Sequence, residues 1–432
     1  MNLPSVDHAD RLLHLSRQML QELVSRVELD SQHRLGEKAQ REQFDTEARQ
    51  WLLQHGSALS VRDRELVVKM MMDEIFGLGP LEVLLHDSTI SDILVNGPRQ
   101  IYVERSGQLE QESALFENEE HLLQVTQRFV NRLGKLLDES HPMVDARLPD
   151  GSRFNAIIPP LSRRGTCISI RRFPKSLSIH DLLQNESLST PMGEFLAAAV
   201  FARLNVLVSG GTGSGKTTLL NVLSNFIPEH ERVITIEDAA ELQLFQPHVL
   251  PLETRPPNIE GRGEVTQRDL VRNALRMRPD RIIIGECRGG EAFDMLQAMN
   301  TGHDGSLTTV HANNTQDALT RVEMLVEMAG LEIPLSTIRR QLAAAIQLLV
   351  HIARLQGGVR RILKISEISS FDGDNIILND LFTFNQTGVD STGKAVGKFA
   401  PTGNLPVHLP RFQAAGLELP PNLFQPTINP EN

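Results

Sequence analysis

The stretch from Asn205 to Thr218, NVLVSGGTGSGKTT, constrains the fold of this chain more than any other stretch. A short apolar segment precedes residues 210–217, which fit the pattern G-x-x-x-x-G-K-[ST]. The pattern predicts a buried strand over residues 205–209, a phosphate-binding loop, and a helix over residues 218–226. The alternative is a glycine-rich turn followed by a chance Lys-Thr pair. The motif is favoured because the strand, loop and helix that it requires are all indicated by the sequence.

Each part of this loop has a chemical role in binding a nucleoside triphosphate. The glycines let the backbone curl so that its N–H groups point inward. Lys216 can reach the β- and γ-phosphates, and the Thr217 hydroxyl can ligate Mg²⁺. We therefore predict ATP and Mg²⁺ as cofactors. The predicted cofactor-binding residues are Gly210, Gly211, Thr212, Gly213, Ser214, Gly215, Lys216, Thr217 and Thr218.

Composition excludes several other classes of protein. The 432 residues are enough for two or three domains, and the net charge of −11 disfavours a general affinity for nucleic acid or acidic lipid. Two distant cysteines, Cys167 and Cys287, provide neither a disulfide framework nor a four-cysteine zinc module. We expect no signal peptide, no membrane span and a reducing cytoplasmic location, so any membrane association would be peripheral.

The order of apolar patterns predicts an α/β protein. From Thr190 onward apolar strands alternate with helices, which indicates a mostly parallel sheet covered on both faces, with nucleotide at the carboxyl ends of its strands. Residues after about Asn385 are rich in Gly, Pro and polar side chains, so we expect a loosely packed tail without chemistry. The predicted segments are a helical segment for docking or packing (1–66), an α/β domain (67–175), a linker (176–189), a P-loop domain (190–385) and a C-terminal tail (386–432).

Polar side chains follow three predicted strands of the P-loop domain. Glu237 ends RVITIE, Glu286 ends RIIIGE and His311 ends SLTTVH. Any one of them could be an ordinary strand terminus, but three in one domain indicate a catalytic edge where a carboxylate orients water or acts as a base. The second strand ends in Gly-Glu where an Asp is usual, so we expect Glu286 to contact the metal through water.

A block of basic residues lies ahead of the P-loop domain. Between Gly151 and His180 there are six basic residues and no acidic one, and Arg147 comes just before. This block could form a solvated sheet face or an interface, or it could supply arginines to ATP phosphates. Contact with nucleic acid is a weaker alternative, because no aromatic residues are interleaved for base stacking.

Several motifs together resemble the secretion ATPases of type II and type IV systems. They are GGTGSGKTT, VITIEDAAEL, LRMRPDRIIIGECRGGEAFDMLQAMNTGHDGSLTTVHAN, DARLPDGSRF and ISIRRF. The match is strongest to the CpaF/TadA-like branch, which drives assembly of tight-adherence (Flp) pili. The resemblance runs from Val67 to Phe424, and the first 65 or so residues resemble the family only in being helical.

The resemblance implies a sensor-like N-domain joined to a RecA-like ATPase domain, a homo-hexameric ring, and ATP held between the two domains. Glu237 would be the base for the attacking water, Glu286 the Walker B glutamate, and His311 a residue near the γ-phosphate. The N-domain arginines would be Arg147, Arg153 and Arg171. Because adjacent strand residues face opposite ways, only one of Arg171 and Arg172 is expected to reach the phosphates.

The function that the resemblance implies is a motor at the cytoplasmic face of the inner membrane, docked on a platform protein, with pilin as its indirect cargo. A hinge near residues 176–189 would let the arginine-bearing domain close. The chain lacks the four-cysteine module of type II exporters and the signature of retraction motors, which favours the tight-adherence branch and leaves extension or retraction open. Alternatives are a DNA- or effector-transfer ATPase of a type IV system and a nucleotide-binding scaffold with little turnover.

Overall fold

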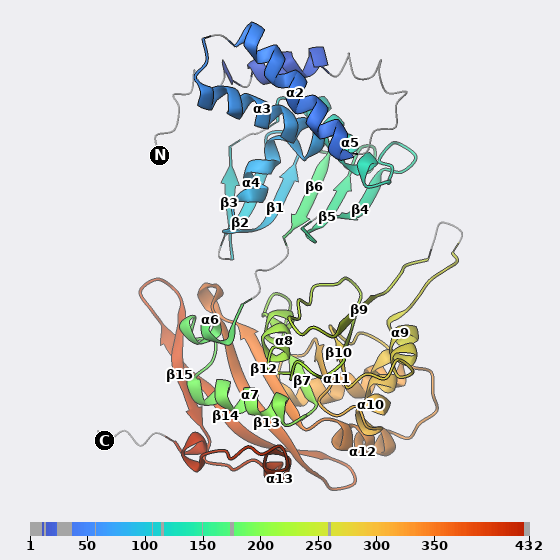
Figure 1. The fold of residues 1–432 in the computed structure, drawn as a ribbon. Helices are drawn as coiled ribbons and strands as arrows, with labels where there is room; N and C mark the ends of the chain where they lie inside the picture. The colour runs from blue at the N-terminus through green and yellow to red at the C-terminus, as the bar shows by residue number, and fades with distance from the viewer. Residues whose placement is uncertain are drawn as a thin grey trace. The chain divides into compact units, whose positions relative to one another are not determined.

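The computed structural model describes residues 11–12, 14–23, 37–56, 58–105, 107–113, 116–148, 150–172, 177–257 and 261–426. The chain divides into two compact units, residues 1–173 and 174–432, which we describe separately (Figure 1). None of the helices in these described ranges combines the length and the apolar character needed to cross a bilayer.

The first unit begins with helices packed on one another. Helical residues 14–23 pack with α2 (Glu37–His55) and α3 (Val61–Phe76). Met19, Trp51 and Met71 are among their buried side chains, and Nε1 of Trp51 donates a hydrogen bond to Glu22 at 2.8 Å. The predicted helical segment is therefore present, although its last helix extends past residue 66.

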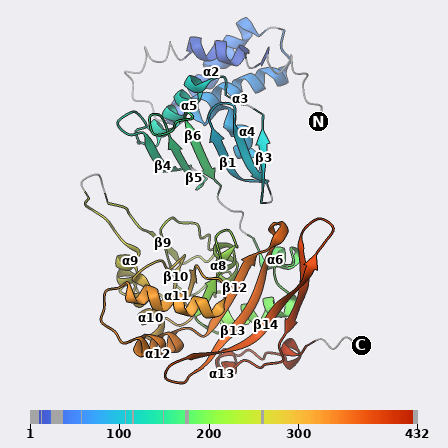
Figure 2. The same cartoon turned by 180° about the vertical axis from the view of Figure 1, so that it is seen from behind.

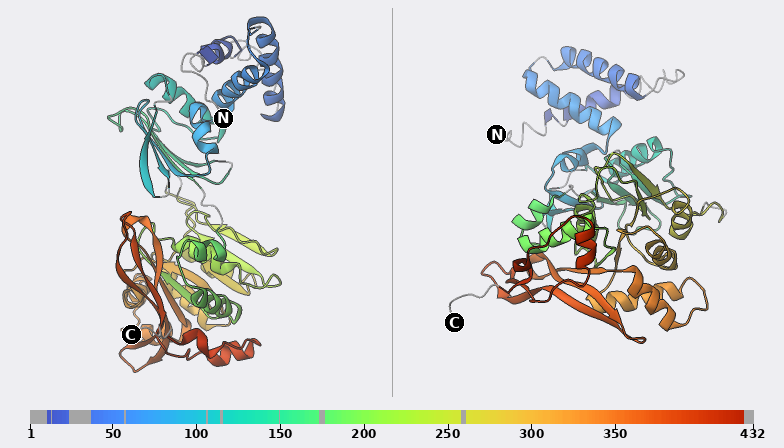
Figure 3. Two further views of the ribbon diagram at one scale, coloured as in Figure 1. Left: turned by 90° about the vertical axis from the view of Figure 1, so that its left-hand side faces the viewer. Right: turned by 60° about the horizontal axis from the view of Figure 1, so that its bottom comes forward.

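An antiparallel six-stranded sheet forms the rest of the first unit, in the order β3-β2-β1-β6-β5-β4. A short helix, α4 (Glu82–His86), and a longer one, α5 (Glu119–Arg132), pack against its apolar face (Figure 3). The rings of Phe129 on α5 and Phe154 on the sheet lie 5.3 Å apart. The strands are β1 (Ile90–Asn96), β2 (Ile101–Arg105), β3 (Gln108–Glu112), β4 (Met143–Arg147), β5 (Arg153–Ile157) and β6 (Cys167–Arg171).

A nine-stranded sheet forms the second unit, in the order β15-β14-β13-β12-β7-β11-β10-β8-β9. The strands from β12 to β9 in this order pair in parallel, whereas β13, β14 and β15 pair antiparallel. The strands are β7 (Val206–Ser209), β8 (Val233–Glu237), β9 (Val249–Glu253), β10 (Arg281–Ile284), β11 (Leu307–Val310), β12 (Leu348–Arg354), β13 (Arg360–Phe371), β14 (Ile376–Val389) and β15 (Ala395–Pro401).

Helices cover both faces of the parallel strands, as Figures 1 and 2 show from opposite sides. Val206 and Val208 of β7 face the core beneath α7 and α8, and Leu207 faces the core beneath α10, α11 and α12. The continuous apolar strands of the sequence are thus explained by burial on both sides. The helices are α7 (Thr190–Phe201), α8 (Lys216–Ser224), α9 (Gln267–Ala274), α10 (Glu291–Asn300), α11 (Thr315–Glu327) and α12 (Leu335–Ala345).

These layers confirm the predicted fold class, an α/β P-loop domain preceded by a smaller α/β domain and helices. A capping box of Thr266 and Asp269 begins α9. β12 and β13 pair as an antiparallel hairpin.

The prediction of a loosely packed tail was wrong for residues 386–426. They form the end of β14, all of β15, α13 (Leu409–Ala414) and η3 (Pro421–Phe424). Phe412 and Phe424 are at most 1% exposed and lie against Phe195 of α7, with ring centroids 5.8 and 5.6 Å apart. Isolated aromatic side chains among Gly and Pro anchor this segment, so no periodic pattern revealed it.

The interval predicted as a linker contributes a helix to the second unit. The helix α6 (Ile179–Gln184) begins with a capping box of Ser178 and Asp181. Leu182 and Leu188 are buried in the same core as α7. Residue 176 lies outside the described residues, and the hinge near residues 176–189 stays a prediction.

Candidate functional site

The phosphate-binding loop lies between β7 and α8, as the sequence predicted. A Cβ atom on Gly210 would lie 2.2 Å from the carbonyl oxygen of Ile352, so the neighbouring strand β12 leaves room only for glycine there. Gly213 and Gly215 have φ values of +70° and +98°, a region that favours glycine. The loop thereby turns sharply into α8, which begins at Lys216.

The Lys216 side chain folds back onto this loop. Only 7% of the residue is exposed, and Nζ donates hydrogen bonds to the carbonyl oxygens of Gly210 and Gly211, each at 3.0 Å. Burial is the main cause that lowers the pKa of Lys216, and the Glu286 carboxylate opposes it. The ammonium group is therefore held at the mouth of the loop, ready to exchange carbonyl acceptors for phosphate oxygens.

Glu286 and His311 meet Lys216 from the adjacent strands β10 and β11. Nε2 of His311 lies 2.9 Å from Oε1 of Glu286 and 3.4 Å from Nζ of Lys216. Burial and the Lys216 charge lower the pKa of His311, whereas the Glu286 carboxylate raises it. The structure thus brings together three of the residues predicted from separate motifs, with the imidazole favoured in its neutral form.

Arg288 adds a cation that the sequence analysis missed. Its guanidinium donates from Nε and Nη2 to Oε2 of Glu286, at 2.8 and 2.6 Å, and Nη1 lies 3.4 Å from Asp238. These carboxylates raise the pKa of Arg288, which keeps the group charged. The position of Arg288 in the sequence could have indicated this ion pair, because a side chain two residues after a carboxylate, in the short loop that follows a strand, can fold back onto it.

Glu237 ends β8 beside the same edge of the sheet. It is 4% exposed, and its carboxylate accepts hydrogen bonds from the backbone N–H groups of Glu241 at 2.9 Å and Leu242 at 3.1 Å. A Cβ atom on Gly285 would lie 2.9 Å from Cγ of Glu237, so the glycine before Glu286 makes room for this side chain. Glu237 is buried next to the Glu286 loop, and its role as a base remains a prediction.

The donor groups at this edge fit a magnesium nucleotide. Oε1 of Glu286 is buried and, apart from its 2.9 Å ion-pair distance to Nε2 of His311, has no hydrogen-bond partner of favourable geometry. Among the described residues, no three His, Cys, Asp or Glu side chains gather into a metal site. Mg²⁺ commonly takes most of its ligands from phosphate and water, so the predicted site needs only Thr217 as a protein ligand and Glu286 behind a water molecule.

The three arginines predicted from the first unit lie in one row. Strand register places Arg147 of β4 opposite Arg153 of β5, and Arg153 opposite Arg171 of β6. Arg172 is separate from this row, because its guanidinium donates to the backbone carbonyls of Asp87 and Ile90. The structure therefore favours Arg171 over Arg172 as the third member, and whether the row meets nucleotide remains untested.

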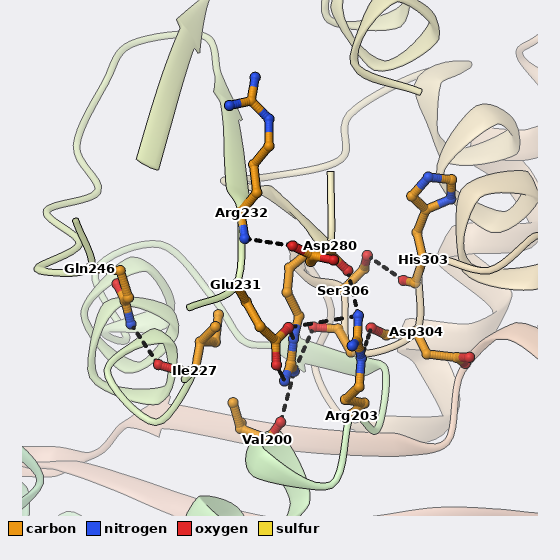
Figure 4. Close-up of polar contacts among 12 residues, drawn as sticks. Val200, Arg203, Ile227, Glu231, Arg232, Gln246, Asp280, His303, Asp304 and Ser306 are labelled. Carbon is orange, nitrogen blue, oxygen red and sulfur yellow. Dashed lines mark hydrogen bonds and ion pairs between the residues drawn. The ribbon is translucent and has the colours of Figure 1, made fainter. Parts of the chain in front are cut away.

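A second charged cluster lies at the opposite, amino ends of the parallel strands (Figure 4). Arg281 begins β10 with no exposed surface, and its Nε and Nη2 donate to the Glu231 carboxylate at 2.7 and 3.0 Å. Its Nη1 donates to the carbonyls of Val200 at 2.7 Å and Gly305 at 3.2 Å. Each nitrogen of this guanidinium has a partner, and its bonds join the end of α7, the turn before β8 and the start of β10.

Comparisons with known proteins identify the family of this chain. The family described as "Type II/IV secretion system protein" matches residues 74–386. A putative conjugal transfer protein of Mycobacterium tuberculosis is 39% identical over 313 residues, covering 71% of this chain and 88% of that protein. The type IV secretion system protein PtlH of Bordetella pertussis is 37% identical, covering 67% of this chain and 94% of PtlH. The crystal structure of the VirB11 ATPase of Brucella suis, at 30% identity, covers 67% of this chain and 96% of its own, with a TM-score of 0.37. The chain belongs to the type II/IV secretion system family and is an ATPase.

Proposed function

We propose that this chain is a Mg²⁺-dependent ATP-hydrolysing motor of a type IV secretion or conjugation machine. The observation that carries the proposal is the meeting of Lys216, Glu286 and His311 within 3.4 Å at the mouth of the phosphate loop. A nucleotide-binding scaffold with little turnover would not need this carboxylate and imidazole beside the site of the γ-phosphate. The cluster therefore favours an enzyme over a scaffold.

The side chains have separate tasks in this proposal. Lys216 binds the β- and γ-phosphates, and Glu237 accepts the proton of the attacking water. Arg288 holds the Glu286 carboxylate, and the neutral imidazole of His311 lies against its other oxygen. When bound by Thr217 and, through water, by Glu286, Mg²⁺ would neutralise charge on the phosphates.

The arginine row of Arg147, Arg153 and Arg171 would supply further positive charge to the phosphates. Strand register brings the three side chains into one row, and guanidinium groups bind phosphate oxygens through charge-assisted hydrogen bonds. Family membership supports a homo-hexameric ring at the cytoplasmic face of the inner membrane, docked on a platform protein.

Which cargo the proposed motor transports is a separate question. Relatives named for conjugal transfer and for type IV secretion support a DNA- or effector-transfer machine. The motif resemblance to the CpaF/TadA-like branch supports a second candidate, a motor for tight-adherence pili with pilin as cargo. We favour transfer, because the named relatives span about nine-tenths of their own length in the match.

The enzymatic part is tested by ATP turnover of the purified full-length chain with and without Mg²⁺. We expect Mg²⁺-dependent phosphate release in the wild type and none in Lys216→Ala. Abundance and thermal unfolding of the variant serve as the control for folding. Equal turnover by wild type and Lys216→Ala would remove the proposed site.

The cargo is tested in the source cell with the same Lys216→Ala substitution. Transfer of a marked plasmid or effector and surface filaments seen by electron microscopy are measured together, with the variant's abundance checked. Loss of transfer with filaments intact supports the favoured reading. Loss of filaments with transfer intact assigns the motor to pilus assembly. DNA-stimulated hydrolysis with a steep salt dependence would point to DNA as the cargo.

A further inference from the structure

The hairpin of β12 and β13 forms a second wall of the phosphate loop, on the side away from β11. β12 pairs in parallel with β7, the strand that leads into the loop. The carbonyl of Ile352 lies over Gly210, and Nδ1 of His351 lies 3.0 Å from Oγ of Ser209. The side chains at the end of this hairpin are therefore held beside the loop by backbone packing.

Two arginines of this hairpin converge on the loop. Nε of Arg360 donates to the carbonyl oxygen of Gly213 at 3.0 Å. Nη1 of Arg354 lies 3.7 Å from the point where a Cβ atom on Gly213 would stand. Both residues are exposed. Two guanidinium groups thus border the same turn of an anion-binding loop.

Arg354 and Arg360 are also direct cross-strand partners in the β12–β13 register. Residues opposite one another share a face of the sheet, so both guanidinium groups come from the same side of the hairpin. The neighbouring Arg361 is buried and donates to the carbonyl of Asn185 at 2.8 Å and the carboxylate of Glu186 at 3.2 Å. The hairpin thus places two exposed arginines side by side next to the phosphate-binding loop.

We infer that Arg354 and Arg360 form a further phosphate-binding pair for the ATP or ADP held by the loop. Guanidinium groups bind phosphate oxygens through paired, charge-assisted hydrogen bonds, and these two lie beside the loop that binds the phosphates. This inference rests on the proposed nucleotide site and adds a contact from the C-terminal strands of the same chain. It does not depend on which cargo the motor drives.

The test is the affinity of the full-length protein for Mg-ADP, measured by calorimetry. We expect Arg354→Ala and Arg360→Ala each to weaken binding about tenfold, as expected for loss of a hydrogen bond to a charged group. Lys398→Ala on β15 is the matched control, since it removes one exposed positive charge from the same sheet, two strands from β13. Its affinity should equal that of the wild type.

Glutamine variants separate phosphate binding from support of the loop. Arg360→Gln keeps an N–H donor for Gly213 but loses the charge, so we expect it to bind as weakly as Arg360→Ala, whereas Arg360→Lys should retain part of the affinity. Wild-type affinity in Arg360→Gln would show that the hydrogen bond to Gly213 is the whole role and would overturn the inference.

Thermal unfolding without nucleotide checks that each variant is folded, and Arg354→Gln provides a second reading if an alanine variant is unstable. Wild-type affinity in all the arginine variants would overturn this inference alone. Failure of the wild type itself to bind Mg-ADP would overturn the nucleotide site and the inference together.

Discussion

The two ends of strands β8 and β10 both carry charged side chains, but they differ in how completely those charges are paired. At the amino ends, the fully buried Arg281 has a partner for every nitrogen and forms an ion pair with Glu231. At the carboxyl ends, Oε1 of Glu286 is buried without a hydrogen bond of good geometry.

This difference indicates that the charges at the amino ends stabilise the sheet, whereas those at the carboxyl ends serve the proposed catalysis. A saturated ion pair holds elements together and has no capacity left for a substrate. An edge with an incompletely bonded carboxylate, a buried lysine and a histidine of lowered pKa has groups that can exchange partners. Substitutions at the two ends should therefore affect different measurements, stability at one end and turnover at the other.

The largest effect is expected at the amino ends. Glu231→Gln leaves Arg281 buried without its counter-charge, which should lower the free energy of unfolding by about 3–5 kcal/mol. Turnover of the protein that remains folded should change little, because this cluster is at the far end of the strands. Chemical denaturation and ATP turnover below the unfolding transition measure the two quantities.

A double variant, Glu231→Leu with Arg281→Met, is the matched control for this prediction. It replaces the pair by apolar side chains of similar size, so much of the lost stability should return. A Glu231→Gln protein as stable as the wild type, or one that folds normally but loses turnover, would contradict the assignment of this cluster to structure.

At the carboxyl ends, Glu237→Gln should change ATP turnover and not stability. Expressed as free energy, its effect should be smaller than that of Glu231→Gln. Loss of the proposed base should lower turnover at least about a hundredfold while ADP binding and unfolding stay near those of the wild type. Glu253→Gln is the control, because Glu253 is the exposed register partner of Glu237 on the edge strand β9. Near-normal turnover by Glu237→Gln would mean that this carboxylate is not the base and has a structural role, such as accepting the backbone N–H groups of Glu241 and Leu242.

The sequence was sufficient for the parts of this fold that repeat a simple physical pattern. Strands buried on both faces read as continuous apolar runs, so β7, β8, β10 and β11 and their polar end residues Glu237, Glu286 and His311 could be located. The phosphate loop was specified by its own spacing. These strands put the polar residues at one edge of the sheet, because parallel strands end at one side of it.

The parts that were missed depend on contacts between distant residues. β15 and the tail are held by Phe412 and Phe424 against Phe195, more than 200 positions earlier in the sequence, and no local period marks such contacts. Arg354 and Arg360 reach the loop only because β12 pairs with β7. The alignment of Arg147, Arg153 and Arg171 likewise depends on strand register, which the sequence alone did not settle.

The smallest expected effect is the pH dependence that His311 adds at the carboxyl ends. Because its pKa is lowered in the folded protein from the usual 6.5, the unfolded chain takes up a proton first as the pH falls below that value. Stability due to this group is therefore fully present above pH 6.5 and is lost as the pH falls toward the folded pKa. The imidazole is 42% exposed, so the loss should stay below about 1 kcal/mol.

Denaturation at pH 7.5 and 5.5 should show wild type losing more stability than His311→Gln. The difference should shrink when Lys216→Met removes one cause of the lowered pKa. A His311→Gln protein that loses as much stability as the wild type would mean that Glu286 compensates fully for burial and for the Lys216 charge.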